Sequence, residues 1–590
     1  MNAAASALVP LPVLLPLLAA GFELALGTRF PRGQRVVSVV VLTAVLGLSV
    51  ALLIAADRHG PITVHLGDFA PPLGITLVAD RLSGLMLTVS SAVTLCVLVY
   101  SLGQGMADRD DRTPLAVFHP SYLLLVAGVS DTFLAGDLVN LYVGFEMMLV
   151  ASFVLLTLGG TASRVRAGST YVVVSLTSSM VFFTAVALTY AAAGTVNLAQ
   201  LAVRFEELPL GVRTLLEATL LTVFAVKAAV FPLAAWLPDS YPTAPAPVTA
   251  VFAGLLTKVG VYCMLRTETL LFPGNRLGHL LLAAALASLV IGVLGAVAQT
   301  DLKRLLSFVL ISHIGYMVFG IGLGSRAGLG GAIVYVVHHI TVQTALFLVA
   351  GLIERRGGTT ELTRIGGLAR AAPLLAALFL LPALNLAGIP PMSGFIGKLE
   401  LLRAGVAEAG GWAYTLVAAA SLTSLLTLYV MAKVWNLAFW RAAPPGRPER
   451  GTVLEEQDTE EDSEEETDET EAARDGGDGG DFGDRQGERD GQDGRDGRDG
   501  RDSREDRGTR ARDGASAPGP AGQAVTATLS GRAITTTTDR PPPTMIWATA
   551  ALVLLSLAYT VLGDPFTSLA DRAAGELLER SPYIEAVLGR

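Results

Sequence analysis

The sequence is poor in charged residues and in cysteine. Asp, Glu, Lys and Arg together make up 16% of the 590 residues, whereas soluble proteins carry about 25%. The two cysteines, Cys96 and Cys263, lie in apolar stretches without the spacing of metal ligands, and we interpret them as small packing residues. These shortages argue against an ordinary soluble domain and against a metal or iron–sulfur centre held by cysteines.

The chain is instead rich in long apolar segments. Hydrophobic residues make up 52% of it, and its mean hydropathy is +0.53. A helix needs roughly 20 apolar residues to cross a bilayer core, and segments of that length occur near residues 6–26, 36–56, 80–102, 116–135, 138–158, 169–191, 214–236, 244–265, 277–299, 304–323, 330–353, 373–401, 412–439 and 545–563. The predicted fold is therefore an all-α polytopic membrane protein with about 14 transmembrane helices.

Charge is distributed unevenly along the chain. The formal net charge is -9, but residues 451–520 alone hold 25 acidic residues and 10 arginines. The surrounding segment 441–543 contains EEQDTEEDSEEETDET, GQDGRDGRDGRDSRED and TTTTDRPPPT and has almost no large apolar side chains, so we predict that it is disordered. It is either a docking or regulatory tail or an insertion that the protein tolerates before its last helix.

Arginine and lysine in the connecting loops predict the orientation. The connections between helices 1–2, 3–4, 5–6, 9–10 and 11–12 carry more of them than the connections on the other side, and such residues favour the cytoplasmic face. Both termini are then expected outside, and segment 441–543 in the cytoplasm. The N-terminal segment has no basic region before its apolar run, so we expect an uncleaved first helix there.

Seven ionisable side chains lie well inside the predicted spans. Glu146 occurs in NLYVGFEMMLVASF, where nearly every neighbour is apolar or uncharged, although burying a charge there is costly. The full set is Glu146, Lys227, Lys258, His313, His338, His339 and Lys398. Ionisable groups inside a membrane mark ion paths and proton relays, because a carboxylate and an ammonium that face each other alter each other's affinity for a proton. The pattern predicts a buried Glu/Lys/His relay for protons.

Each of these residues also has a plainer interpretation. A lysine near a helix end extends its ammonium to the lipid headgroups, although Lys258 lies near the middle of its span. Glu146 fits a neutral acid that is hydrogen-bonded between helices, and His313 fits a packing histidine. Of His338 and His339 at most one is expected to act, because adjacent residues on a helix point about 100° apart.

Proline interrupts two of the spans that carry lysines. Pro232 follows Lys227, and Pro390 and Pro391 precede Lys398. If helices 4–8 and 9–13 form two inverted five-helix repeats, the interruptions fall in the fourth helix of each repeat, which are helices 7 and 12. Interrupted spans at corresponding positions of two repeats are typical of a transport path, because unwound backbone at membrane depth must be buried in protein or line a cavity.

These observations predict five parts along the chain. They are transmembrane helices 1–3 in residues 1–115, a first five-helix repeat in 116–266, a second in 277–440, a disordered linker rich in acidic residues, glycine and arginine in 441–543, and the last transmembrane helix with a C-terminal tail in 545–590.

Four stretches resemble one family of membrane proteins. They are NLYVGFEMMLVASFVLLTLGG, KAAVFPLAAWLPDSYPTAPAPVTAVFAGLLTKVGVY, DLKRLLSFVLISHIGYM and LAGIPPMSGFIGKLELL, and the likeness covers nearly the whole chain except 441–543. The family is the proton-translocating antiporter-like family, which includes the large membrane-arm subunits of respiratory complex I and the large subunits of Mrp-type multisubunit cation/proton antiporters. Within it the chain is most similar to the Mrp-type branch.

The resemblance implies roles for the ionisable residues. By motif, Glu146 corresponds to the family's helix-5 glutamate, Lys227 to its helix-7 lysine and Lys258 to its helix-8 lysine. His313 corresponds to the helix-10 histidine, His338 or His339 to the helix-11 link, and Lys398 to the helix-12 lysine. The family's path for protons has a cytoplasmic entrance and an exit near Lys398. Gln343 departs from the family, because relatives often have a lysine there, so the central path is expected to depend more on His338, His339 and water.

Three functions are consistent with these residues and are compared below. The favoured one is the proton-conducting subunit of a multisubunit Na⁺ or similar monovalent cation/proton antiporter in the plasma membrane, which needs other subunits and is a transporter rather than an enzyme. The alternative is a proton-pumping, non-redox membrane subunit of an NADH–quinone oxidoreductase or related hydrogenase. A scaffold with inactive relay residues is disfavoured by the charges that the chain retains. No nucleotide cofactor is expected, since GLGSRAG near Gly322 lies between two spans and not after a strand. No other cofactor and no nucleic-acid partner are expected either.

Overall fold

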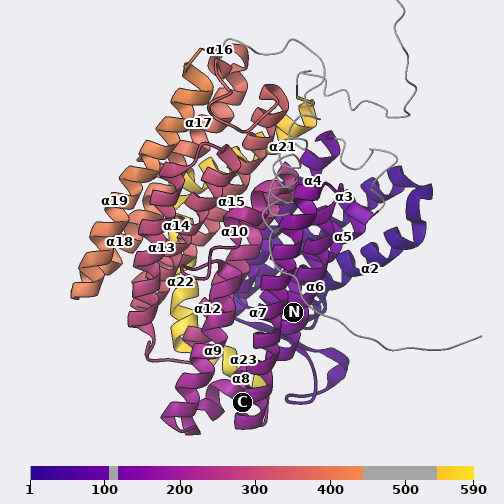
Figure 1. The fold of residues 1–590 in the computed structure, drawn as a ribbon. Coiled ribbons are helices and arrows are strands. Elements are labelled where there is room, and N and C mark those ends of the chain that lie inside the picture. The colour runs from indigo at the N-terminus through magenta and orange to yellow at the C-terminus, as the bar shows by residue number, and fades with distance from the viewer. Residues whose placement is uncertain (1, 105–116, 443–540, 590) are drawn as a thin grey trace, which may run out of the picture. The chain divides into compact units, whose positions relative to one another are not determined.

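The computed structural model describes residues 2–104, 117–442 and 541–589, and its regular structure is almost wholly helical (Figure 1). The predicted disorder of 441–543 concerns residues that lie almost entirely outside these ranges. The elements up to residue 270 are α1 (Asn2–Leu8), α2 (Leu11–Leu26), α3 (Pro31–His59), β1 (Ile62–His65), β2 (Thr76–Ala79), α4 (Arg81–Gln104), α5 (Phe118–Leu134), α6 (Leu138–Thr157), α7 (Ala162–Ala193), α8 (Leu198–Arg204), α9 (Leu210–Ala228), α10 (Leu237–Ser240), α11 (Ala246–Val251) and α12 (Thr257–Leu270).

The remaining elements complete the helical bundle. They are α13 (Gly278–Ala298), α14 (Leu302–Leu323), α15 (Arg326–Gly357), α16 (Leu368–Ala371), α17 (Pro373–Ala387), α18 (Ser393–Ala407), α19 (Gly411–Val434), α21 (Pro543–Val561), α22 (Gly563–Glu579) and α23 (Ser581–Leu588). Two π-helical turns, Phe252–Leu256 and Trp435–Trp440, lie before α12 and after α19.

Eleven helices of the described ranges are long and apolar enough to cross a membrane, judged by length and composition. The other three predicted spans coincide with α5, α9 and the pair α17–α18, which are not among those eleven. The all-α membrane fold is thus confirmed. The count of about 14 spans and the inverted repeats stay predictions.

The helices form a buried centre with an apolar outer layer. In α11–α12, α14 and α15 nearly all residues of the apolar stretch are buried. In α2, α3, α7, α19 and α21 well under half of them are buried. The outer helices expose large apolar side chains such as Met180, Phe183 and Leu425, as expected of helices in contact with lipid. Six of the seven predicted relay residues lie on or beside the central helices or on the two interrupted ones, α9 and α17–α18.

Two lysine-bearing segments are interrupted. α9 stops where Ala229 takes a left-handed conformation with φ 57°, and the chain stays irregular until α10 begins. α17 stops where Gly388 takes the same conformation with φ 84°, and α18 begins at Ser393. A left-handed residue is a common end for a helix, and the backbone groups freed there are available to side chains.

A small hairpin marks one end of the bundle. β1 and β2 pair antiparallel, with Ile62 opposite Ala79 and Val64 opposite Leu77. α23 contacts both α8 and β1, and Figure 1 shows α8 and α23 at the bottom of the view and α16 at the top. We call these two ends the hairpin end and the α16 end.

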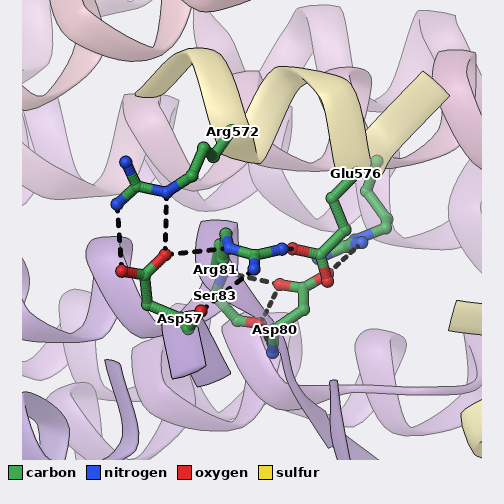
Figure 2. A network of polar contacts seen from close by, with 7 residues as sticks. Asp57, Asp80, Arg81, Ser83, Arg572 and Glu576 are labelled. Atoms are coloured by element: carbon green, nitrogen blue, oxygen red, sulfur yellow. Dashed lines mark hydrogen bonds and ion pairs between the residues drawn. The ribbon is translucent and has the colours of Figure 1, made fainter. Parts of the chain in front are cut away.

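The C-terminal segment, which the sequence analysis described only as a tail, forms a strap of two helices. α22 is amphipathic, packs mainly along α15 and also touches α4 and α12. Figure 2 shows the ion pairs that hold it: Arg572 binds both carboxylate oxygens of Asp57 on α3 at 3.0 and 2.9 Å. Arg81 of α4 bridges Asp57 at 2.9 Å and Glu576 of α22 at 2.7 Å.

A second pair continues this network toward α12. Arg266 binds Asp80 at 2.6 Å, and Asp80 caps α4 by accepting a hydrogen bond from the amide of Ser83 at 2.8 Å. Burial opposes the charge of Asp80, but Arg266 and Ser83 outweigh it and lower the pKa of Asp80 below its usual value. Burial, together with the charge of Asp80, raises the pKa of Glu576 from its usual 4.5 to about 7. The strap therefore carries a carboxyl that titrates near neutrality.

Candidate functional site

Glu146 lies on α6, whose start is fixed by a side-chain cap. The Asp137 carboxylate accepts a hydrogen bond from the amide of Asn140 at 2.7 Å, which satisfies one of the free N–H groups at the start of the helix. Glu146 is partly buried, and its Oε1 atom is buried without a hydrogen-bond partner. Tyr142, one turn earlier, interacts with the same carboxyl group. The unpartnered oxygen is a place for a proton or a water molecule.

Lys227 lies in the last turn of α9, two residues before the first break. Its ammonium interacts electrostatically with Glu146 and lies 5.9 Å from the centre of the Phe145 ring, but these two charged side chains form no direct ion pair. A cavity of about 30 Å³ adjoins Lys227, which is room for a water molecule. Its other walls include Phe145, Tyr171, Trp236 and Tyr241.

Lys258 lies at the start of α12 and has no exposed surface. The π-helical turn Phe252–Leu256 shifts the backbone hydrogen bonds just before it, and the Lys258 ammonium donates a hydrogen bond to the carbonyl of Ala253 at 2.7 Å. It also interacts electrostatically with His313 and His339. An ammonium has three N–H groups, so Lys258 retains donors for water or for neighbouring groups.

Three histidines and a tyrosine form a connected cluster between α14, α15 and α18. The hydroxyl of Tyr335 lies 2.7 Å from His313 Nδ1, and the ring centres of His313 and His339 are 5.2 Å apart. His338 Nδ1 lies 3.0 Å from Ser393 Oγ. Both ring nitrogens of His339 and the Nε2 atom of His338 are buried without partners. Because an imidazole both accepts and donates protons, the cluster is suited to passing them on.

Lys398 lies on α18 and is held by neutral groups. Its Nζ atom donates hydrogen bonds to the carbonyls of Leu386 and Ala387 at 3.0 and 2.9 Å and to Ser424 Oγ at 2.9 Å. It also lies 5.1 Å from the centre of the Tyr316 ring. The two carbonyls are at the C-terminal end of α17, where the helix dipole favours a cation, and a ring face attracts an ammonium.

The structure brings the predicted residues together in three groups. Glu146 and Lys227 form the first, Lys258 stands alone, and the third contains the histidines and Lys398. Lys258 connects with the third group through its electrostatic interactions with the histidines. His338 and His339 face different neighbours, as adjacent residues on a helix should. Their separate roles stay predictions.

The neutral groups that hold the charges were not predicted from the sequence. Tyr335 and Tyr316 stand three residues from His338 and His313, and this helical spacing was a usable signal that they share a face. Ser424 gave no such signal, because it lies on a different helix from the lysine it binds. Backbone acceptors cannot be found from side-chain patterns, since only the fold decides which carbonyls a break leaves free.

Gln343 lies one turn beyond His339 on α15. Its Nε2 atom donates a hydrogen bond to the carbonyl of Leu306 at 2.9 Å, and its Oε1 atom is buried without a partner. A neutral amide therefore fills the place where the family resemblance implies a lysine. That the path depends more on the histidines for this reason stays a prediction.

A larger polar cavity lies at the α16 end. Its volume is about 510 Å³, and its charged walls are Arg164, Asp239, Asp301, Lys303, Arg304 and Glu354. Two ion pairs, Lys303–Glu354 at 2.7 Å and Arg304–Asp239 at 3.0 Å, cross it. Its three basic residues lie at the first turns of α7 and α14, in the connections between predicted spans that the arginine and lysine bias predicts to be cytoplasmic. No group of three or more His, Cys, Asp or Glu in the described parts of the chain is arranged to hold a metal ion.

Comparison with known proteins identifies relatives of this chain. Residues 135–427 match the family described as NADH:quinone oxidoreductase/Mrp antiporter, TM, and this match includes all seven predicted relay residues. One relative, a Na(+)/H(+) antiporter subunit of Alkalihalophilus pseudofirmus, is 42% identical over 437 residues, which is 73% of this chain and 87% of the relative.

Two solved structures also resemble it. A chain of the Mrp complex from Dietzia sp. DQ12-45-1b has a TM-score of 0.79 and 30% identity, and the match covers 99% of this chain and 99% of that one. A chain of respiratory complex I from Thermus thermophilus with bound NADH has a TM-score of 0.65 and 28% identity, with 75% of this chain and 91% of that one covered.

Proposed function

The chain belongs to the NADH:quinone oxidoreductase/Mrp antiporter family of membrane proteins, and we propose that it conducts protons as one subunit of a multisubunit antiporter that exchanges Na⁺ or a similar monovalent cation for protons. It is a multi-pass protein of the plasma membrane, and a transporter subunit that works with other subunits of a hetero-oligomeric complex. Transport is driven by ion gradients and the membrane potential, since moving one charge across 100 mV is worth about 2.3 kcal/mol.

One observation supports proton conduction above all others: ionisable side chains follow one another through the buried centre of the bundle. Glu146 and Lys227 interact across α6 and α9, and Lys258 interacts with His313 and His339. Each change of protonation alters the charge that the next group faces, so the groups titrate as a coupled set. A coupled set of this kind moves protons through a low-dielectric interior without leaving an isolated charge there.

The polar cavity at the α16 end is the proposed entrance for protons. Pro238 and Pro242 line that cavity, and Trp236 and Tyr241 of the same segment line the small cavity beside Lys227. One short stretch of chain thus separates solvent from the first charged pair. A proton that passes this stretch reaches Glu146 and Lys227 by way of the water-sized cavity.

The second half of the proposed path runs through the histidine cluster to Lys398. His313 is hydrogen-bonded to the Tyr335 hydroxyl at Nδ1 and receives a proton at its other ring nitrogen, Nε2. His338 and Ser393 continue the line toward α18, which carries Lys398. The ammonium of Lys398 releases its proton when a neighbour becomes protonated, because two buried cations repel each other.

A second candidate function uses the same relay with another source of energy. In that case the chain is a proton-pumping, non-redox subunit of an NADH–quinone oxidoreductase or related hydrogenase, as the similarity to complex I suggests. The higher TM-score and fuller coverage with the Mrp complex, and the 42% identity to an antiporter subunit, favour the antiporter.

The test is cation-dependent collapse of a pH gradient in inverted vesicles that contain the full set of companion subunits. Glu146→Ala should lower the rate about 100-fold or more, as expected when a positioned proton-transfer group is removed, while blots show that the complex assembles. Glu408→Gln, which changes an exposed glutamate, is the control and should keep the wild-type rate. Full activity of Glu146→Ala would show that Glu146 is a structural acid, and a wild-type complex without any cation-dependent signal would favour the redox-driven alternative.

A further inference from the structure

Two buried glutamates lie outside the relay described above. Glu217 on α9 has 0% of its surface exposed and Glu268 on α12 has 8%. None of their four carboxylate oxygens has a hydrogen-bond partner. Buried carboxylates are normally paired or hydrogen-bonded, so two unpartnered ones require an explanation.

The packing of α9 against α12 places these two glutamates side by side. The helices contact each other along their length, and they run antiparallel: Arg213 Nη2 donates a hydrogen bond to the carbonyl of Pro273 near one end, and the backbone at Gly260 touches the backbone at Ala228 near the other. In this register Glu217 lies level with Glu268. The two carboxylates also repel each other electrostatically.

The surroundings of the pair contain basic groups that remain incompletely bonded. Arg213 and Arg276 interact electrostatically with Glu217, and the backbone amide of Leu277 faces it. Arg213 is buried to nine-tenths, and its Nε atom has no hydrogen-bond partner. Unfilled donors beside unfilled carboxylates indicate a polar site that holds something small, such as a proton or water.

The pair lies between the relay and the hairpin end. Glu217 precedes Lys227 by ten residues on the same helix, which is about 15 Å along the axis. Beyond the pair, Arg580 binds the carbonyl of Leu270 at 3.0 Å and Glu206 at 2.9 Å, and Glu206 is exposed. A group at this depth is positioned to exchange protons with the outer solvent on one side and with the relay on the other.

We propose that Glu217 and Glu268 form a further proton site of this chain, in which two carboxylates share one proton near the hairpin end. Two carboxylates at close quarters in a dry interior do not both ionise, and one proton between them removes the repulsion. When the proton moves between them, an O–H bond breaks at one carboxyl and forms at the other. The pair passes this proton on when a second proton arrives from the opposite side, so it returns to one proton and one negative charge after each transfer. The site rests on the proposed function, since it serves as an outer station for protons that the relay carries.

The experiment uses the whole complex in two measurements. The first is cation-dependent proton transport for Glu217→Gln, Glu268→Gln and the double variant, with Glu207→Gln, an exposed residue of the same end, as the control. The second is infrared difference spectroscopy in H₂O and D₂O, which detects the carbonyl stretch of a protonated carboxyl group without any need for transport. Glutamine keeps the shape of the side chain, and assembly is verified by blot.

If the two carboxylates share a proton, each single variant lowers transport about tenfold or more. The double variant is then no slower than the singles, because two residues that act as a unit are non-additive. The infrared band of the wild type shifts in each single variant, because one buried carboxyl remains and stays protonated. The band disappears in the double variant and remains unchanged in Glu207→Gln. Where a glutamine variant does not assemble, Glu217→Asp and Glu268→Asp keep both carboxyls, and the band shifts in each of them.

Other outcomes overturn the proposal or separate it from the proposed function. Wild-type transport in both single variants, with the band unchanged, would show that the pair is not a proton site. A band absent from a wild-type complex that transports normally would overturn the shared proton alone. A band that is present in the wild type, shifts in the single variants and is lost in the double variant, in a complex without cation-dependent transport, would support the pair and overturn the antiporter. An apparent affinity for Na⁺ that falls in the variants, without loss of any band, would identify a cation site instead.

Discussion

The two helix breaks have the same backbone but hold their lysines differently. At each break a left-handed residue, Ala229 or Gly388, ends the helix, and the next amide bonds to the carbonyl five positions back, at 2.9 Å in the first and 3.1 Å in the second. Lys227 precedes its break by two residues and faces Glu146, whereas Lys398 follows its break by ten and binds backbone carbonyls. A common scaffold thus carries two different ways of stabilising a buried ammonium.

The second helices of the two predicted repeats, α6 in the first half and α14 in the second, show the same contrast. Asp137 caps α6 and Asp301 caps α14, each by accepting a hydrogen bond from the amide three residues on, at 2.7 and 2.8 Å. Nine residues after the cap stands Glu146 in the first half but Leu310 in the second. The second half lacks an acid at the matching place, and the end of α17, Ser424 and the Tyr316 ring take over its task. The likeness of caps and breaks supports the predicted repeats.

The largest expected effect comes from reversing charges in the first half. Glu146→Lys and Lys227→Glu should each abolish transport, a loss of about 100-fold or more, because each buries two like charges near each other. The double variant restores opposite charges and should recover at least tenfold over either single variant, in line with the coupling of close charge pairs. The measurement is proton transport in inverted vesicles containing the assembled complex.

No recovery in the double variant would mean that Glu146 and Lys227 act independently. The second half offers a control for this interpretation, since Lys398 has no acidic partner among its contacts. Lys398→Glu should abolish transport to the same extent. Adding Leu310→Lys should not restore it, because α14 and α18 do not pair a charge at position 310 with one at position 398.

A smaller effect is expected from exchanging the left-handed residues. Gly388→Ala places a side chain in a left-handed conformation, which costs roughly 1–2 kcal/mol, and its Cβ atom would lie 2.9 Å from Lys398 Cδ. The ammonium should shift from its carbonyls, and transport should fall about tenfold, which corresponds to roughly 1.4 kcal/mol. Ala229→Gly relieves the same strain in the first break, so transport should stay near the wild-type level, with thermal stability changed by less than about 1 kcal/mol.

These two variants distinguish the breaks by a single methyl group. The checks are the transport rate and the thermal unfolding midpoint of the complex. If Gly388→Ala keeps its rate, the carbonyls of Leu386 and Ala387 do not hold the lysine during transport. If Ala229→Gly lowers the transport rate as much as Gly388→Ala, the packing of the Ala229 methyl group contributes more than the relief of its left-handed strain.

A still smaller effect is expected from removing the one side-chain acceptor of Lys398. Ser424→Ala deletes a hydrogen bond of 2.9 Å and leaves the two carbonyls in place. One such bond contributes about 1 kcal/mol, so the transport rate should fall about fivefold. Ser421→Ala, an exposed position of the same helix, is the matched control. An unchanged rate for Ser424→Ala would assign the whole stabilisation of the ammonium to the end of α17 and the Tyr316 ring.

The sequence was sufficient to predict the class of fold and the buried charges. Long apolar spans predict membrane helices directly, and an ionised residue within a span is conspicuous because its neighbours are apolar. Pro232 and Pro391 marked the interruptions, because a proline inside a helix removes a backbone hydrogen bond and favours a break. Each of these signals is local, so one residue and its neighbours along the chain are enough to recognise it.

The groups that hold the charges were not predictable in the same way. The acceptors of Lys398 come from α17 and α19, and the pairing of Glu217 with Glu268 depends on how α9 and α12 pack. Both glutamates were missed, although each is an acid within a largely apolar helix. The strap formed by α22 was missed because its apolar face is short and its ion pairs reach Asp57 and Arg81, more than 400 residues earlier.

The smallest expected effect concerns the strap, which packs mainly on α15 of the second half and less on α12 of the first. The pKa of Glu576 is about 7 in the docked strap, against its usual 4.5, because burial and Asp80 oppose its charge. Docking of the strap therefore takes up a proton. The contribution of Glu576 to the stability of the docked strap is complete below about pH 4.5 and is lost as the pH rises to about 7.

Amide hydrogen exchange in α22 should quicken a fewfold between pH 5 and pH 8, after correction for the intrinsic rate. Glu576→Gln, which cannot ionise, should remove this dependence and leave the Arg572–Asp57 pair intact. If instead the amides of α22 become better protected at high pH, the Arg81–Glu576 ion pair outweighs the burial of the carboxyl, and the strap then ties α15 and α12 together most firmly when the relay faces an alkaline solution.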